Sequence, residues 1–351
     1  MIFLEESGTE AYTADVVSAA TDRLRRLISG FQGKTIVVVG DVIIDEYLFG
    51  KPARISREAP VLILRFSERE VRLGGAANAA HNVRALGARA LPIGVVGKDA
   101  AGDELLGLFH GAHMPTDGLA IETGRVTPMK TRIMAGGYQA TRQQVVRLDR
   151  EPGGEPQPMT EDAMLTRLSA LGERADAFVI SDYGYGTVTP RVFERVRALA
   201  RRTNATVTAD SRYQLVRFAG VTAATPNEAE LEQLTGMPAD DERSVEKAGR
   251  QLLERLDARI LLVTRGSRGM ALLERDGATT FMPIHGTDEI ADVTGAGDTV
   301  IRVFTLALAA GAAPLEAATL ANIAGGLVVM KRGSATVAPA ELRQALGAPP
   351  S

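Results

Sequence analysis

The clearest candidates for catalytic residues form the segment 292–298, Asp-Val-Thr-Gly-Ala-Gly-Asp. The small residues Gly295, Ala296 and Gly297 let backbone N–H groups approach an anion, and the apolar stretch after them is typical of a helix whose positive end adds to this anion hole. A carboxylate at Asp298 could take the proton of an attacking hydroxyl while the amides stabilise phosphate charge. The alternative is a tight glycine turn with an Asp helix cap.

Strand and helix patterns alternate along the rest of the chain. Apolar, β-branched runs are found at 35–41, 90–97, 176–182, 205–210, 220–227 and 259–266. Helical spacings of apolar residues are found at 14–29, 75–86, 159–173, 190–202, 228–235 and 242–257. This alternation predicts a doubly wound α/β core, with a mostly parallel sheet and helices on both faces.

Two segments, 47–73 and 126–149, interrupt this alternation. They contain extended runs without helical periodicity, and Gly136-Gly137 between two candidate strands favours a hairpin. We therefore predict a small β lid inserted into a core domain of 31–345. Residues 1–30 are predicted to form a loose tail followed by an amphipathic helix.

Composition excludes several classes of protein. The chain has 351 residues, of which 45% are hydrophobic and 24% charged, as in ordinary globular proteins. It has no cysteine, which excludes disulfides, thiolate metal sites and a Cys nucleophile. A net charge of -3 without basic patches argues against nucleic acid as a partner. Without a signal peptide or a membrane-spanning run, we expect a cytoplasmic protein with no membrane partner.

The motifs together resemble those of the ribokinase family of carbohydrate and nucleoside kinases. Segment 292–298 matches the family signature D-x-T-G-A-G-D in full, and 73–78, Leu-Gly-Gly-Ala-Ala-Asn, is similar to its N-terminal signature. The resemblance implies a ribokinase-like fold that uses ATP, with Asp298 as the base. It also implies that Gly74, Gly75 and Asn78 contact the sugar. Alone, the second segment would more often be a helix start.

The resemblance also implies a nucleotide site. Residues 227–230, Asn-Glu-Ala-Glu, match the family's N-x-x-E, so Asn227, Glu228, Ala229 and Glu230 are expected near the ATP phosphates. Asn227 and Glu230 would hold Mg²⁺ through water, because Mg²⁺ takes few direct protein ligands. A helix capping box at the same residues is compatible with this role. A monovalent cation is a further possibility.

Two other nucleotide contacts follow from the same resemblance. Thr264, Gly266 and Gly269 fit a T-x-G-x-x-G turn that touches the ATP phosphates, although this pattern alone usually marks a hairpin turn. Asn322 is similar to a position that borders adenine; otherwise it is a surface helix residue.

Candidate acceptor ligands follow predicted strands, where open α/β sheets bind ligands. Asp45 comes after the first strand and is similar to a family carboxylate that binds sugar hydroxyls, and Asp182 ends another strand. The alternative for each is a capping Asp in a turn. Lid residues such as Arg142 suit an acceptor that already carries a phosphate, or else they form a solvated face. The basic lid residues are Lys130, Arg132, Arg142 and Arg147.

Segments 54–61 and 142–149 are similar to the kinase half of the heptose-phosphate kinase and adenylyltransferase proteins. This resemblance implies phosphorylation of the anomeric hydroxyl of D-glycero-β-D-manno-heptose 7-phosphate, in ADP-heptose and lipopolysaccharide core synthesis. Arg57 stands where these proteins usually have Pro, and Arg302 where they have a small residue. A cation at 302 is expected to perturb the base or crowd the phosphates.

Three alternatives remain open at this stage. The chain could act on another sugar or phosphosugar, or it could be a catalytically silent ligand-binding regulator on the same fold. A nicotinamide oxidoreductase is disfavoured because no strand-linked G-x-G-x-x-G is present. We also expect a homodimer formed through the β lid, because its apolar runs would otherwise leave strand edges open to water.

Overall fold

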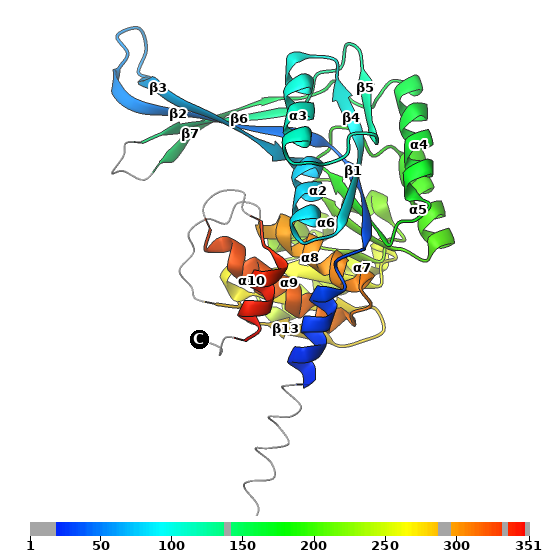
Figure 1. Cartoon of the computed structure of the whole chain (residues 1–351). Coiled ribbons are helices and arrows are strands. Elements are labelled where there is room, and N and C mark those ends of the chain that lie inside the picture. Colours follow the sequence, from blue (N-terminus) through cyan, green and yellow to red (C-terminus); the bar gives the residue numbers. More distant parts are fainter. Residues whose placement is uncertain (1–18, 137–141, 287–295, 332–335, 348–351) are drawn as a thin grey trace, which may run out of the picture.

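The computed structural model describes residues 19–136, 142–286, 296–331 and 336–347, and the strands in these ranges form two sheets (Figure 1). The larger sheet has nine strands in the order β13-β12-β11-β10-β9-β8-β1-β4-β5. Its strands are β1 (Thr35–Gly40), β4 (Arg89–Gly97), β5 (Leu119–Glu122), β8 (Ala177–Asp182), β9 (Thr206–Ser211), β10 (Ala223–Ala224), β11 (Ile260–Thr264), β12 (Met270–Glu274) and β13 (Thr279–Met282). From β5 to β11 every pair is parallel, and β12 and β13 are antiparallel.

The central strand β1 shows why this sheet has helices on both faces. Its side chains from Ile36 to Val39 are all 0% exposed, as a strand covered on both sides requires. Ile36 and Val38 pack in one core cluster, and Val37 and Val39 pack in a second cluster on the opposite face. The predicted doubly wound, mostly parallel α/β fold is therefore confirmed.

Each face is covered by its own set of helices. The first face carries a helix of residues 19–29, α2 (Gly75–Ala85), α3 (Ala100–Gly111), α8 (Ala296–Ala309), α9 (Pro314–Val329) and α10 (Pro339–Ala345). The second face carries α4 (Pro158–Gly172), α5 (Pro190–Thr203), α6 (Glu228–Thr235) and α7 (Glu242–Leu256). Short 3₁₀ turns are η1 (Leu215–Phe218) and η2 (Gly266–Arg268). Among the described residues, no helix is long and apolar enough to cross a membrane.

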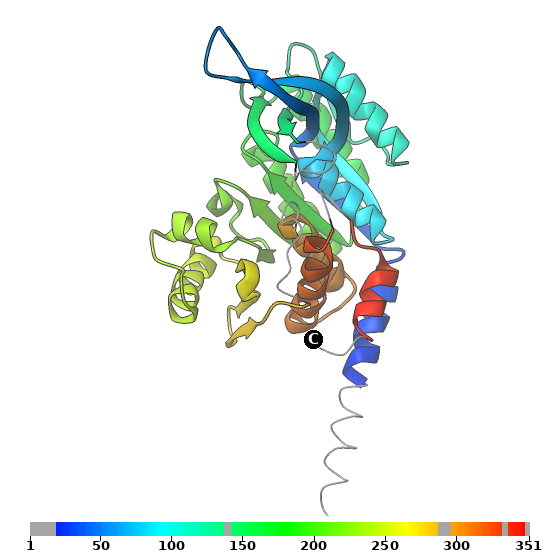
Figure 2. The same cartoon turned by 90° about the vertical axis from the view of Figure 1, so that its left-hand side faces the viewer.

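The helix of residues 19–29 packs in the core on the first face of the larger sheet. Leu27 and Ile28 are buried in the same cluster as α9, and Arg23 forms a 3.2 Å ion pair with Glu316 of that helix. It lies beside α10 in Figures 1 and 2, where Arg343 donates to Ser29 Oγ. The predicted loose tail before it lies outside the described residues.

The smaller sheet extends away from the core in Figure 1 and is strongly curved in Figure 2. Its strands are β2 (Val42–Ile55), β3 (Leu62–Gly74), β6 (Met129–Ala135) and β7 (Gln143–Arg150), in the order β3-β2-β6-β7. They cover most of the segments 47–73 and 126–149, and we call this sheet the lid. β2 begins directly after β1, so Asp45 lies inside a strand and does not cap a turn.

Some predicted boundaries differ from the structure. Within the run 220–227 the regular strand is only two residues long, Ala223 and Ala224, and Asn227 adds an isolated parallel bridge to Thr264 beyond Pro226, which has no backbone N–H to donate. Helix α3 and the strands β5, β12 and β13 were not assigned from the sequence. The strands β12 and β13 form an antiparallel hairpin at the edge of the sheet. The apolar pattern of their residues resembles that of the parallel strands before them, so the sequence does not distinguish the two kinds of pairing.

Candidate active site

Three aspartates lie at the carboxyl ends of the neighbouring parallel strands β1, β8 and β9. Asp41, just after β1, is 1% exposed and accepts backbone N–H groups of the loop 183–187 at 2.8 to 3.3 Å. Burial raises the pKa of Asp41. Asp41 therefore organises this loop, whereas Asp182 of β8 and Asp210 of β9 face a cavity.

Asp298 lies in the first turn of α8, with 17% of its side chain exposed. Its Oδ2 accepts a 3.3 Å hydrogen bond from Asn78 Nδ2 of α2. The two signature motifs, 220 residues apart in sequence, therefore meet at this carboxylate. Ala296 begins α8, and Gly295 lies outside the described residues.

A cavity of about 510 Å³ brings Asp298 together with residues of the predicted nucleotide site. It is lined by Asp182, Tyr183, Asp210, Arg212, Thr225, Asn227, Glu230, Thr264, Gly297 and Asp298. Sequence reasoning missed Asp210, although the run Ala-Thr-Val-Thr-Ala-Asp ends in Asp just as the run before Asp182 does. Burial raises the pKa of Asp210 to about 7, against a lowering effect of the nearby Arg302.

The segment 227–230 forms the capping box that its sequence allowed. Asn227 Oδ1 accepts the Glu230 N–H at 2.9 Å, and Glu230 Oε2 accepts the Asn227 N–H at 3.0 Å. Burial raises the pKa of Glu230. Glu228 instead pairs with Arg265 and Arg268, at 2.9 and 2.8 Å, and so ties α6 to the turn η2.

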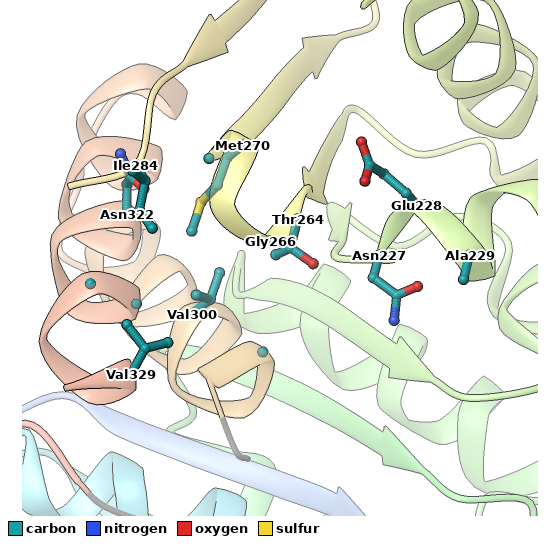
Figure 3. Close-up of a pocket in the computed structure, with 14 residues that line it drawn as sticks. Asn227, Glu228, Ala229, Thr264, Gly266, Met270, Ile284, Val300, Asn322 and Val329 are labelled. Atoms are coloured by element: carbon teal, nitrogen blue, oxygen red, sulfur yellow. The ribbon is translucent and has the colours of Figure 1, made fainter. Parts of the chain in front are cut away.

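A second cavity of about 410 Å³ shares Asn227, Thr264 and Gly297 with the first (Figure 3). Its lining is Asn227, Glu228, Ala229, Thr264, Gly266, Gly269, Met270, Ile284, Gly297, Val300, Asn322, Gly325, Gly326 and Val329. In Figure 3, Met270, Val300 and Val329 gather at one end, and the Asn227 amide lies at the other. The cavity therefore offers an apolar slot that leads to polar groups and glycines, which suits a base joined to phosphates.

Glycines keep the walls of this second cavity close together. A Cβ on Gly326 of α9 would lie 2.1 Å from His285 O, and one on Gly269 would lie 2.0 Å from Met282 O. Gly269 also has a φ of +80°, in the left-handed region that favours glycine. Residues 264–269 connect the antiparallel strands β11 and β12, so they form a hairpin turn and also line the cavity.

The di-glycine before α2 is required by its neighbours. A Cβ on Gly74 would lie 2.6 Å from Asp45 Oδ2, and one on Gly75, whose φ is +54°, would lie 2.4 Å from Asp41 O. Asp45 Oδ1 in turn accepts a hydrogen bond from Arg132 at 2.5 Å. Asp45 therefore lies directly against the di-glycine, and the structure brings these predicted acceptor residues together.

Two predicted acceptor residues differ in their placement. Asp182 accepts from Ser211 Oγ at 2.6 Å and lines the cavity that contains Asp298. Arg142 does not join this group: it is exposed, it lies 4.1 Å over the Phe49 ring, and it lines a separate cavity of the lid with Glu68. Because the lid is curved, Arg142 just before β7 lies away from the cavity that contains Asp298, and a sequence pattern does not contain this curvature.

Lys130 lies closer to the core than Arg142. Its Nζ donates to Tyr185 Oη at 2.9 Å and lies 5.8 Å from the centroid of the Tyr183 ring. Burial lowers the pKa of Lys130. A cation and two tyrosines therefore stand where β6 of the lid meets the loop after β8.

The fold, with two joined cavities at the carboxyl ends of its strands, is that of an ATP-dependent sugar kinase. The chain belongs to the pfkB family of carbohydrate kinases, which matches residues 34–341. It is 40% identical over 312 residues to "Bifunctional protein HldE" of Geobacter sulfurreducens, covering 89% of this chain and 62% of that one. It is 39% identical to HldE of Gluconacetobacter diazotrophicus, covering 91% of this chain and 65% of that one. The chain thus spans less than two thirds of these relatives.

Solved structures share the fold at low sequence identity. Arabidopsis thaliana ribokinase, complexed with ribose and ATP, has a TM-score of 0.70 and 18% identity, over 91% of this chain and 100% of that chain. Phosphofructokinase-2 from Escherichia coli, in complex with fructose-6-phosphate, has a TM-score of 0.72 and 17% identity, over 89% and 98%. These likenesses confirm the ribokinase-like architecture.

Proposed function

We propose that this chain transfers the γ-phosphoryl group of ATP to the anomeric hydroxyl of D-glycero-β-D-manno-heptose 7-phosphate, giving the 1,7-bisphosphate in ADP-heptose and lipopolysaccharide core synthesis in the cytoplasm. The identity of about 40% with HldE proteins over nearly the whole chain supports this acceptor. The single observation that carries the reaction type is the position of Asp298, which lines a cavity with Asn227, Thr264 and Gly297 and contacts Asn78 of the second motif.

In the proposed reaction, Asp298 accepts the proton of the acceptor hydroxyl. The hydroxyl oxygen bonds to the γ-phosphorus while the bond from that phosphorus to its bridging oxygen breaks, and ADP leaves with the electron pair. The N-terminus of α8 at Ala296 and Gly297 supplies N–H groups and a positive dipole end for the transferred group. Asn78 holds one oxygen of the carboxylate toward the acceptor side.

The residues of the second cavity fit a bound ATP. Met270, Val300 and Val329 would cover the base, Asn322 stands beside them, and the phosphates would extend toward Thr264 and Gly297. The carboxylates of Glu230 and Asp210 line the adjoining cavity, and these oxygen donors suit hydrated Mg²⁺. When bound, Mg²⁺ would neutralise phosphate charge.

The acceptor is proposed to lie on the di-glycine, between the core and the lid. Asp45 and Asn78 would bind sugar hydroxyls, because Asp45 lies against Gly74 and Asn78 against Asp298. Arg132 and Lys130 add positive charge on the lid side. This charge suits an acceptor that carries a phosphate better than a neutral sugar.

We also propose that two chains pair through their lids. Several large apolar side chains of the lid are between 41% and 70% exposed: Ile55, Leu62, Phe66, Val145, Val146 and Leu148. Such a concentration of exposed apolar surface on one thin sheet is costly for a monomer, and a two-fold contact would bury the apolar side chains of one face in both subunits.

An acceptor panel tests the proposed function. ADP release should be measured with ATP and Mg²⁺ in the presence of heptose 7-phosphate, fructose 6-phosphate or ribose. We expect the highest kcat/KM with heptose 7-phosphate. A clear preference for another acceptor would identify a different sugar kinase. No ADP release with any of them, together with intact ATP binding, would favour the silent regulator.

A further inference from the structure

Arg302 is the largest wholly buried side chain among the described residues, at 0% exposure. It lies on α8 one turn after Asp298 and lines neither the cavity that contains Asp298 nor the second cavity joined to it. Its side chain is therefore directed away from the space proposed for the phosphates. The guanidinium points instead beneath the proposed base, toward the ends of β8 and β9.

The contacts of Arg302 centre on Asp298. Nη1 donates to the backbone oxygen of Asp298 at 2.8 Å and to its Oδ1 at 2.9 Å. The same nitrogen lies 3.8 Å from Asp210 Oδ2, and Nη2 lies 3.5 Å from Ser181 Oγ. Nε is buried and has no hydrogen-bond partner among the described residues.

This arrangement is a poor device for stability. Burying a guanidinium carries a large desolvation penalty, which an incomplete set of partners does not offset, and apolar side chains of similar size often stabilise such positions equally well. The contacts do, however, define the orientation of one carboxylate. Arg302 holds Oδ1 from within α8, and Asn78 contacts Oδ2 from α2. Each oxygen of Asp298 therefore has a separate donor, so rotation of the carboxylate would break both contacts.

We propose that Arg302 is a positioning residue for Asp298: it fixes Oδ1 so that Oδ2 is the oxygen that receives the acceptor proton. The proposal rests on the proposed role of Asp298 as the base. Arg302 touches neither substrate, and its effect passes through the orientation of one side chain. Losing that orientation should slow proton transfer and leave the binding of ATP and acceptor unchanged.

The test compares Arg302→Met and Arg302→Lys with a control, Thr305→Val, in steady-state kinetics and ATP binding. Thr305 lies one turn further along α8, is 0% exposed, and bonds to Thr208 Oγ1 at 2.7 Å. Met fills the space without a charge, and Lys restores a cation that can reach Oδ1. We expect kcat to fall about 10- to 100-fold in the Met variant, with both KM values within about three-fold, and to recover partly in the Lys variant. Thr305→Val should keep its kcat.

Three outcomes would overturn the proposal. The first is an unchanged kcat in a folded Met variant. The second is a rise in the ATP KM of that variant as large as its fall in kcat, and the third is a fall in kcat of the Thr305→Val control as large as that of the Met variant. If the Met variant does not fold, Arg302→Gln, which keeps one donor, replaces it under the same criteria. Failure of the proposed function is a separate result, because the wild-type chain would then release no ADP or Asp298→Asn would remain active.

Discussion

Asn82 and Asn78 lie one turn apart on α2, and the Nδ2 of Asn82 donates both to the backbone oxygen of Asn78, at 3.0 Å, and to its Oδ1, at 3.3 Å. The second contact fixes the orientation of the Asn78 amide: its Oδ1 faces Asn82, and its Nδ2 therefore faces Asp298. Because Asn82 is 2% exposed, water cannot easily replace this contact. A buried chain of amides therefore supports the proposed base from the acceptor side.

We predict that Asn78→Ala lowers kcat/KM about 10- to 100-fold, because a hydrogen bond to a charged group is lost. Asn82→Ala should have a smaller effect in the same direction, since Asn78 would keep its own contact part of the time. Initial-rate measurements over a range of acceptor concentrations check both. An Asn82→Ala variant that is slower than Asn78→Ala would contradict this order.

Asp210 gives a prediction for stability against pH. Burial raises its pKa from 3.8 to about 7, so the folded state binds a proton that the unfolded state releases. Its contribution is therefore fully present below pH 3.8 and is lost as the pH rises through about 7. Between pH 6 and 8 the wild-type chain should lose on the order of 1 kcal/mol relative to Asp210→Asn.

Urea unfolding of both proteins at pH 6 and pH 8, without ATP or Mg²⁺, measures this difference. Groups that do not interact with Asp210 titrate equally in the two proteins, so their contributions cancel. A difference in unfolding free energy that does not change with pH would contradict the raised pKa.

Helix α9 approaches the second cavity so closely that one methyl group should disturb it. Gly326→Ala would bring a Cβ to 2.1 Å from His285 O, a backbone atom that has to move. We expect weaker ATP binding, by about ten-fold, with little change in the acceptor KM. Gly107→Ala is the matched control, because a Cβ there has nothing within 4 Å. Calorimetric titration with ATP should separate the two variants.

The lid pairing is tested on its most exposed large apolar residue. Phe66 is 70% exposed, and Phe66→Lys with Val145→Lys should convert a dimer to a folded monomer with a raised acceptor KM. Light scattering gives the mass, and ATP binding should remain near normal. A double variant that stays dimeric and fully active would rule out pairing through this surface.

The core fold could be predicted from sequence because its signals are local. The continuous apolar run of β1 requires burial on both faces, and alternation with amphipathic helices then fixes the doubly wound class. The capping box at Asn227 and Glu230 is likewise encoded within four residues. Asp298 and Asn78 could be named as site residues, but their contact depends on how α2 and α8 pack.

Other features depend on long-range geometry that no local pattern contains. In the sequence, Arg302 is an isolated charged residue on an apolar helix, and only the packed structure shows that it donates to Asp298 Oδ1. Arg142 is predicted near the acceptor because a basic lid suits a phosphorylated substrate, yet it lines a separate cavity of the lid together with Glu68. Asp210 becomes part of the site only through the pairing of β9 beside β8.

The most direct test of the account is the turnover of Asp298→Asn with ATP, Mg²⁺ and the best acceptor. The amide keeps the shape of the carboxylate but cannot accept the hydroxyl proton, so kcat should fall by at least about 10³-fold, while ATP affinity stays within a few-fold. Retention of more than about a tenth of the wild-type kcat would contradict the role of Asp298 as the base.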